Sequence, residues 1–279
     1  MRSSVLLLTA MALSLNVAAL ATPAAPQHSG SAQSVYIEDL TWPEVKAAIA
    51  AGKTTAIIYA GSTEQNGPHM AIGKHNVIVR YAAGEIARRL GNALVAPVLA
   101  YVPEGGFDPP QGHMNFPGTV GVAEPVYAAI LRDAASSLAL AGFRLICFLG
   151  DHGDSQAAQT RVAGSLTRLW RRRGIRVATL GRYYAGNGQA EWLTGQGFSA
   201  AQIGEHAGLL DTAELMAIAP ELVRAELLAP KTWPAGATGA RGDPTLASAG
   251  IGRKLLELKI AAGAAEAGEI AQAMGLPKR

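Results

Sequence analysis

The chain has little cysteine, few aromatic residues and few charges. Of its 279 residues, one is cysteine, 6% are aromatic and 16% are charged. A single cysteine excludes an internal disulfide and any metal site built from several thiolates. Because Cys147 lies inside the apolar run 143–149, we expect a buried, unreactive thiol. Without disulfides, the fold must be held together by its hydrophobic core.

Charge of one sign is not concentrated anywhere along the chain. The formal net charge is +3 at pH 7, and basic residues are scattered apart from the triplet Arg171, Arg172 and Arg173. A nucleic-acid-binding surface needs a basic stripe or patch, so we expect no nucleic-acid partner. The triplet is expected to end a helix, where cations complement the helix dipole.

Long apolar runs are also absent, with one exception near the start. Arg2 is followed by an apolar run over 5–21 that ends in Ala-Leu-Ala, a small-x-small pattern typical of signal-peptide cleavage. Residues 1–21 are therefore predicted to be a signal peptide, and the protein to be periplasmic or secreted. An uncleaved anchor is the alternative, although the run is short and alanine-rich for a membrane span.

The remaining sequence divides into a short leader and one long segment. Residues 22–34 are rich in Ala, Pro, Ser and Gln, which predicts a disordered leader. Residues 35–279 contain no Pro/Ser-rich linker and have a length that one layered α/β fold commonly reaches, so we expect a single domain. No second long apolar run follows, so no membrane span is expected after cleavage.

Strand-like and helix-like segments alternate through this domain. The strand candidates are short apolar runs, which suit interior parallel strands: 54–60, 93–100, 143–149 and 175–180. The helix candidates have apolar residues at helical spacing or clear start and stop residues: 42–51, 76–90, 124–141, 155–173, 211–218 and 246–274. This alternation predicts a three-layer α/β/α fold with a mostly parallel sheet.

Two long segments do not fit the alternation. Residues 103–119 are dense in glycine and proline, and loops of that length within compact domains are usually functional, so we expect this loop to form one wall of a site. Residues 181–204 are rich in glycine and have no clear periodicity. Substrate specificity is expected to depend on both segments.

Charged and histidine side chains follow the predicted strands. Glu64 comes four residues after the strand candidate 54–60, His75 follows in the same connection, and His152 comes directly after the strand candidate 143–149. The carboxyl ends of neighbouring parallel strands meet at one edge of a sheet. Two imidazoles and one carboxylate hold a catalytic zinc while leaving a position for water. We therefore predict a metal-dependent hydrolase, with Asp154 as a further ligand or as a residue that orients one.

Several motifs resemble those of the creatininase family of metal-dependent amidohydrolases. They occur in the family's order and span nearly the whole of the predicted domain: Gly-Ser-x-Glu-Gln-x-Gly-Pro-His at 61–69, Phe-Pro-Gly-Thr at 116–119, Gly-x-His at 150–152, Glu-His-Ala-Gly at 205–208 and Gly-Asp-Pro-Thr-Leu-Ala at 242–247. The resemblance implies the family's α/β/α fold and an amidohydrolase activity. It also implies a homo-oligomer, which in most members is a hexamer.

The resemblance implies a metal site in which some ligands have changed. Family members bind two divalent metals through positions that match Glu64, Asn66, His75, His152 and Asp154. Asn66 stands where the family has a histidine, and His75 stands where the family has a bridging aspartate. An aspartate bridges two cations, whereas a neutral imidazole offers one lone pair to one metal. We therefore expect one Zn or Mn ion rather than two, held by Glu64, His75 and His152, with weaker support from Asp154 or Asn66.

The resemblance also implies roles around the metal. His206 matches a histidine that moves a proton, and Asp154 or Glu64 would orient or accept a proton from water. His69 and His113 also lie in loops after predicted strands and are expected to line the pocket. Gly153 replaces an aromatic residue of the creatininase pocket, so the predicted substrate is another small polar molecule with a cyclic amide or related C–N bond. The alternative is a catalytically degenerate member that binds a small ligand.

Overall fold

The computed structural model describes residues 34–228 and 237–276. The predicted signal peptide and all of the predicted leader except Ser34 lie outside the described residues. Four strands form one parallel sheet in the order β2-β1-β3-β4: β1 (Thr55–Ala60), β2 (Ala93–Val95), β3 (Leu145–Gly150) and β4 (Arg176–Thr179). Every strand therefore presents its carboxyl end at the same edge of the sheet.

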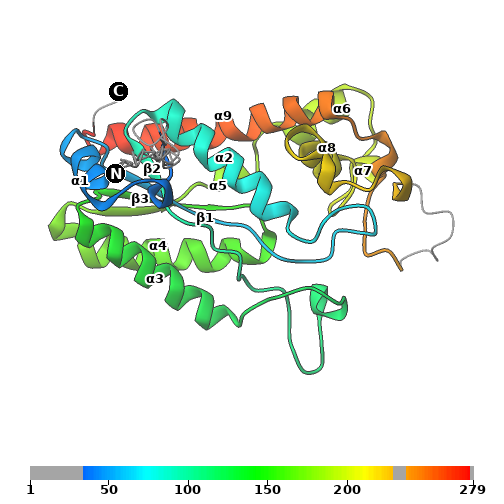
Figure 1. Ribbon diagram of the computed structural model, residues 1–279, viewed down its shortest axis with the longest axis horizontal. Helices are drawn as coiled ribbons and strands as arrows, with labels where there is room; N and C mark the ends of the chain where they lie inside the picture. Colours follow the sequence, from blue (N-terminus) through cyan, green and yellow to red (C-terminus); the bar gives the residue numbers. More distant parts are fainter. Residues whose placement is uncertain (1–33, 229–236, 277–279) are drawn as a thin grey trace, which may run out of the picture.

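Helices cover both faces of the sheet (Figure 1). One face packs against α3 (Glu124–Ala141) and α4 (Gln156–Trp170). The other face packs against α2 (Lys74–Leu90) and the long C-terminal helix α9 (Ala249–Ala273). The three-layer α/β/α fold with a parallel sheet, predicted from the alternation of strands and helices, is thus confirmed.

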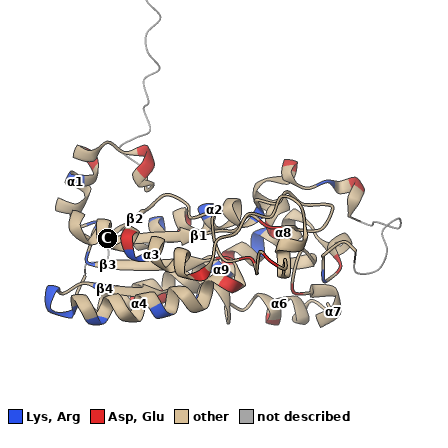
Figure 2. Ribbon diagram, turned by 90° about the horizontal axis from the view of Figure 1, so that it is seen from below, with Lys and Arg blue, Asp and Glu red and all other residues tan. Residues whose placement is uncertain are grey.

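The two faces are separated by the alternation of side chains along each strand. In β3, Cys147 and Leu149 point toward α2 and α9, whereas Ile146 and Phe148 point toward α3 and α4. Because both faces are covered, the strands are apolar throughout, and β1, β2 and β3 carry no charged residue (Figure 2). Cys147 is fully buried and unpaired, as predicted.

The remaining helices lie around this frame. The first helix, α1 (Trp42–Ala50), packs its half-buried apolar residues against the core on the α3 side. Four short helices follow β4, namely α5 (Gly181–Tyr184), α6 (Gln189–Gly195), α7 (Ala200–Ile203) and α8 (Leu209–Ile218). Of these, α6, α7 and α8 lie beyond one end of the sheet (Figure 1).

Two elements differ from the sequence-based expectation. The strand expected over 93–100 ends at Val95, because Pro97 has no N–H to continue a ladder, and the chain returns to the sheet only as a bridge between Leu99 and Ala60. The segment 181–204, which has no clear periodicity, contains α5, α6 and α7. Within the described residues, no helix combines the length and the apolar character that a membrane crossing requires.

Candidate metal centre

The candidate site lies at the carboxyl edge of the sheet, and Glu64 enters it from the loop that follows β1. This loop runs against the start of α2: a Cβ atom added to Gly61 would lie 2.1 Å from Oδ1 of Asn76 and 2.7 Å from its backbone. Only glycine allows so close an approach. The glutamate side chain is completely buried. The local sequence thus places an ionisable group where water is excluded.

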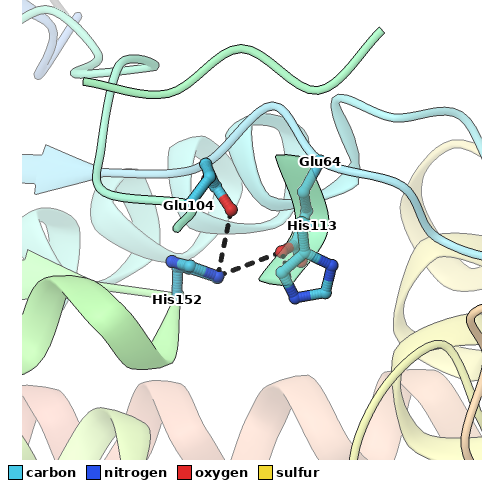
Figure 3. A group of neighbouring side chains, drawn as sticks. All are labelled: Glu64, Glu104, His113 and His152. Carbon is cyan, nitrogen blue, oxygen red and sulfur yellow. Dashed lines mark ion pairs between the residues drawn. The ribbon is translucent and has the colours of Figure 1, made fainter. Parts of the chain in front are cut away.

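Four side chains from three separate segments converge there. Glu64, Glu104, His113 and His152 each offer one ligand atom, and these atoms all lie within 4.8 Å of one another (Figure 3). Oε2 of Glu64 lies 3.0 Å from Nε2 of His113 and 3.0 Å from Nε2 of His152. Nε2 of His152 also lies 3.4 Å from Oε2 of Glu104. Glu104 and His113 both come from the glycine- and proline-rich loop over 103–119.

The spacing of these atoms fits a shared divalent ion. Ligands held about 2.0–2.1 Å from a tetrahedral zinc lie about 3.3 Å from one another, close to the three contacts of 3.0, 3.0 and 3.4 Å that involve Nε2 of His113 and Nε2 of His152. Oε2 of Glu64 and Oε2 of Glu104 are buried and make no well-aligned hydrogen bond, although both face imidazole nitrogens at 3.0–3.4 Å. Buried carboxylate oxygens without a partner are costly, and a bound cation would satisfy both. The donor set of two imidazoles and two carboxylates therefore fits a zinc or manganese ion.

The two carboxyl groups differ in their surroundings. Burial raises the pKa of Glu64, but His152 and His75 outweigh this effect and hold that pKa well below its usual value. Burial also raises the pKa of Glu104, and the neighbouring Glu64 carboxylate adds to the rise, against a 2.6 Å hydrogen bond from the Ser62 hydroxyl. One carboxylate is thus already ionised, and the second gains most from a nearby cation.

His75 lies in the first turn of α2, where both of its ring nitrogens face carboxylates. Nε2 lies 2.8 Å from Oε1 of Glu64, and Nδ1 lies 2.8 Å from Oδ2 of Asp151. Burial and the charge of Lys74 lower the pKa of His75, but the two carboxylates outweigh them and raise it to about 9. In this structure, both ring nitrogens of His75 are therefore engaged by carboxylates.

His206 approaches from the segment before α8. Its Nε2 lies 2.9 Å from the backbone oxygen of Gln65, and its Nδ1 lies 3.7 Å from Oε1 of Glu64. Burial and the charge of Lys74 lower the pKa of His206 to about 4. The next residue, Ala207, has a φ of 52°, which is uncommon for a residue other than glycine. Its N–H donates to Asp211, 2.8 Å away, and this bond holds the turn that orients His206.

The other predicted site residues lie outside the four-residue group. Asn66 is buried, and its amide nitrogen donates to backbone oxygens of the same loop, including that of Glu64 at 3.0 Å. Asp154 is exposed on the wall of the cavity above the group. His69 is buried with its Nε2 3.0 Å from the hydroxyl of Thr212. Of the predicted ligands, the structure brings Glu64 and His152 into the group and places His75 beside it.

The position of Gly153 is filled from another element. A Cβ atom at residue 153 would lie 3.0 Å from the hydroxyl oxygen of Tyr184, which lines the same cavity. The tyrosine comes from the end of α5. An aromatic side chain at residue 153 would have to displace the Tyr184 hydroxyl, and in this chain Tyr184 supplies an aromatic wall of the cavity.

The sequence-based prediction missed three residues at or near this centre, and it expected His113 only to line the pocket. Glu104 and His113 lie in the loop that was expected to form a wall, but no local pattern distinguishes them as donors. Asp151 was not predicted, because the neighbouring His152 was interpreted as the functional residue of that segment. Lys259 did carry a signal, because it occupies a buried helical face between Leu255 and Gly263, where a lysine is rarely found without a partner.

Comparison with known proteins decides the family. Residues 38–266 match the sequence profile described as creatininase, creatinine amidohydrolase. The chain belongs to the creatininase family. Its relatives include a creatinine amidohydrolase of Pseudomonas putida, 28% identical over 199 residues that cover 68% of this chain and 74% of the relative. A mycofactocin precursor peptide peptidase of Mycobacterium tuberculosis is 29% identical over 224 residues, covering 71% and 78% of the two chains.

Solved structures agree with this assignment. A crystal structure of creatinine amidohydrolase superposes with a TM-score of 0.71 at 26% identity, covering 87% of this chain and 98% of that chain. A manganese form of creatininase gives a TM-score of 0.71 at 25% identity, with coverage of 87% and 99%. This creatininase-family protein is therefore a hydrolase by family, and its relatives act on C–N bonds.

Proposed function

We propose that this protein is an exported, metal-dependent amidohydrolase that opens a cyclic amide or related C–N bond of a small polar substrate. The observation that carries the proposal is the group of four donors, Glu64, Glu104, His113 and His152. Three of them line a cavity of about 350 Å³, which is a volume suited to a small molecule. One zinc or manganese ion would be held there.

The residues around the ion divide the chemistry between them. A divalent ion in this position supplies Lewis-acid activation of a carbonyl group and of water. Nε2 of His206 donates to a backbone oxygen, so Nδ1 faces the site without a proton; it would accept one from the attacking water and then pass it to the leaving nitrogen. Asp154 on the cavity wall would orient water or the substrate. Burial of the Glu64, Glu104 and His152 side chains would limit the access of competing water.

The identity of the substrate is narrowed by the cavity wall. The relatives named above act on creatinine and on a precursor peptide, so the family accommodates C–N bonds in molecules of different size. Tyr184 fills the space beside Gly153 in this chain. We therefore propose a substrate other than creatinine. Its polar groups would interact with charged residues that line the cavity, such as Asp154, Glu205 and Arg241.

The proposal is tested first on the unmodified protein. Metal content is measured by elemental analysis after expression with zinc or manganese, and the melting temperature is measured with and without each ion. Hydrolysis is then assayed with a panel of cyclic amides and short peptides. We expect about one ion per chain, a higher melting temperature with the ion, and turnover of at least one cyclic amide. Protein without bound ion that neither metal stabilises would overturn the proposal.

The ligand set is tested by a matched pair of substitutions. Glu104→Gln removes one buried donor, whereas Glu124→Gln removes an exposed carboxylate that pairs with Arg161 on the surface. We expect Glu104→Gln to weaken zinc binding at least tenfold and Glu124→Gln to leave it unchanged. If Glu104→Gln retains full affinity and His75→Ala loses it, the ligand set is instead the one predicted from the sequence.

The alternative of a degenerate ligand-binding protein makes a different prediction. His152→Ala should abolish turnover in a metal hydrolase and leave ligand affinity intact in a binding protein. Export rests on the apolar run near the start of the sequence, and cell fractionation tests it. The homo-oligomer stays a prediction that light scattering would check.

A further inference from the structure

A buried carboxylate with both oxygens engaged lies directly beneath the candidate metal centre. Asp151 follows β3 and is 5% exposed. Its Oδ1 accepts hydrogen bonds from Nζ of Lys259 at 2.8 Å and from the hydroxyl of Tyr183 at 2.7 Å. Its Oδ2 lies 2.8 Å from Nδ1 of His75. Three elements other than its own strand therefore fix the orientation of this carboxylate: α9, α5 and α2.

The chain of contacts continues from Asp151 to a proposed metal ligand. The opposite nitrogen of His75, Nε2, lies 2.8 Å from Oε1 of Glu64. The imidazole is thus held at both ends, and it occupies one oxygen of the glutamate. The other oxygen, Oε2, is the atom that faces His113 and His152. The contact with His75 thus determines which oxygen of Glu64 is presented to the metal.

Lys259 is itself held in place from a second side. Its Nζ lies 3.0 Å from Oε2 of Glu214 on α8, and Oε1 of Glu214 accepts from the amide nitrogen of Gln189. The lysine side chain is 7% exposed. Among the hydrogen bonds and ion pairs of the described residues, this network reaches the metal-facing atoms only through His75. The network therefore contacts the proposed metal ligands at one residue, Glu64, through His75.

We propose that Asp151, fixed by Lys259 and Tyr183, is a positioning residue that acts through His75 to orient the Glu64 carboxylate for metal binding. The proposal rests on the proposed function, since it concerns the same ion. Outer partners of this kind set the orientation of a ligand, and their loss typically weakens metal binding by about 10–100-fold. Neither Asp151 nor the three residues bonded to it need to touch the ion.

A purely structural role is the competing explanation. In that case the network would only fasten α9 to the sheet, and its loss would lower stability without a specific effect on the metal. A structural role predicts a loss of stability with unchanged metal affinity, whereas a positioning role predicts a loss of metal affinity in protein that is still folded. Metal affinity measured on folded, metal-depleted protein therefore separates the two explanations.

The sharpest test compares two buried tyrosines. Tyr183→Phe removes the hydroxyl that donates to Asp151. Tyr127→Phe removes an equally buried hydroxyl, which accepts a 2.8 Å hydrogen bond from Gln159 on the other face of the sheet. Each variant loses one buried hydrogen bond and keeps its ring. Zinc affinity is measured by competition with a chromophoric chelator, and the melting temperature of the metal-free protein is measured alongside.

We expect Tyr183→Phe to weaken zinc binding several-fold and to shift the visible spectrum of the cobalt-substituted protein. Tyr127→Phe should lower the melting temperature by a similar amount with no change in zinc affinity or spectrum. Asp151→Asn should have the larger effect, about a 10–100-fold loss of zinc affinity. Lys259→Arg, which keeps the charge, should recover part of the affinity lost in Lys259→Met.

The result that overturns the proposal is equal zinc affinity in the unmodified protein, Tyr183→Phe and Asp151→Asn. The proposal also fails if Tyr127→Phe weakens zinc binding as much as Tyr183→Phe. Failure of the proposed function has a different signature, because the unmodified protein would then bind no zinc at all. If Asp151→Asn does not fold, the tyrosine pair alone decides the question.

Discussion

The two faces of the sheet are built on different principles. Toward α3 and α4, the strands meet an apolar layer in which the buried side-chain hydrogen bonding centres on Gln159, which reaches Tyr127 and the Ser155 hydroxyl. Toward α2 and α9, an apolar layer of similar extent gives way near the carboxyl edge to a network of buried ions that includes Asp151, Lys259 and Glu214.

This difference concerns stability: apolar packing stabilises both faces, whereas the buried ions of the α9 side are not expected to add to it. Replacing a buried ion pair by well-packed apolar residues is often neutral or stabilising, so such a network is weak evidence for stability. Its position beside the candidate metal centre, and its absence from the apolar layer on the α3 side of the described chain, point to a role in the site. Both faces contribute an apolar core, and the buried ions beside the candidate site lie on the α9 side.

The largest effect is expected when the ionic network loses its cation. Lys259→Met leaves Asp151 and Glu214 buried without their lysine, and we expect the free energy of unfolding to fall by about 3–5 kcal/mol. Adding Glu214→Leu removes one of the stranded charges and should recover part of the loss. Chemical denaturation of the two variants measures this coupling. An unchanged stability in Lys259→Met would show that the network is not ionic in solution.

A comparable test of the apolar face is Leu131→Ala. Leu131 on α3 is fully buried, so the substitution removes transfer free energy and leaves a cavity, with an expected cost of about 2–5 kcal/mol. Zinc affinity of the folded fraction should stay as it was. A large loss of zinc affinity from this remote substitution would contradict the proposal that the metal centre depends on the α9 side and not on the α3 side.

A smaller effect is expected at the surface of the α9 face. Arg89 on α2 and Glu257 on α9 form an exposed ion pair at 2.5 Å. Exposed pairs of this kind contribute about 0–1 kcal/mol, so Arg89→Met should change the free energy of unfolding by no more than that. Thermal unfolding at low and high salt measures it. A fall in the free energy of unfolding as large as that of Lys259→Met would mean that burial does not determine how much an ion pair contributes to stability.

The smallest effect is expected from thiol reagents. Burial raises the pKa of Cys147 to about 12, which leaves almost no thiolate at neutral pH, and the sulfur is also out of reach of solvent. We expect no labelling of the native protein and complete labelling after unfolding in denaturant. Rapid labelling without denaturant would show that the sheet opens easily at β3.

The fold was predictable because its signals are local. The apolar strands, the glycine stop at Gly91 and the alternation of elements all follow from residues near one another in sequence, and the motifs of the creatininase family agree with them. The end of β2 was misplaced because Pro97 interrupts an otherwise apolar run. Propensity alone does not show how the chain continues beyond such a break.

The site was predictable only in part, for a physical reason. Glu64 and His152 follow strands, so their edge of the sheet could be inferred from topology. Glu104 and His113 depend on the path of an irregular loop, which residue spacing does not specify. The contact between Lys259 and Asp151 joins residues far apart in the chain, and whether His75 acts as a ligand or as a link between carboxylates is decided by such contacts.

The placement of Lys259 on the last helix has a consequence for biosynthesis. Every proposed metal ligand has left the ribosome well before α9 is complete, yet Asp151 gains its cation only when that helix docks. On the proposal above, a chain in which α9 has not yet docked would carry the donors without the lysine that orients Asp151. Such a chain would bind the ion about 10–100-fold more weakly than the folded protein, so docking of α9 would strengthen the site.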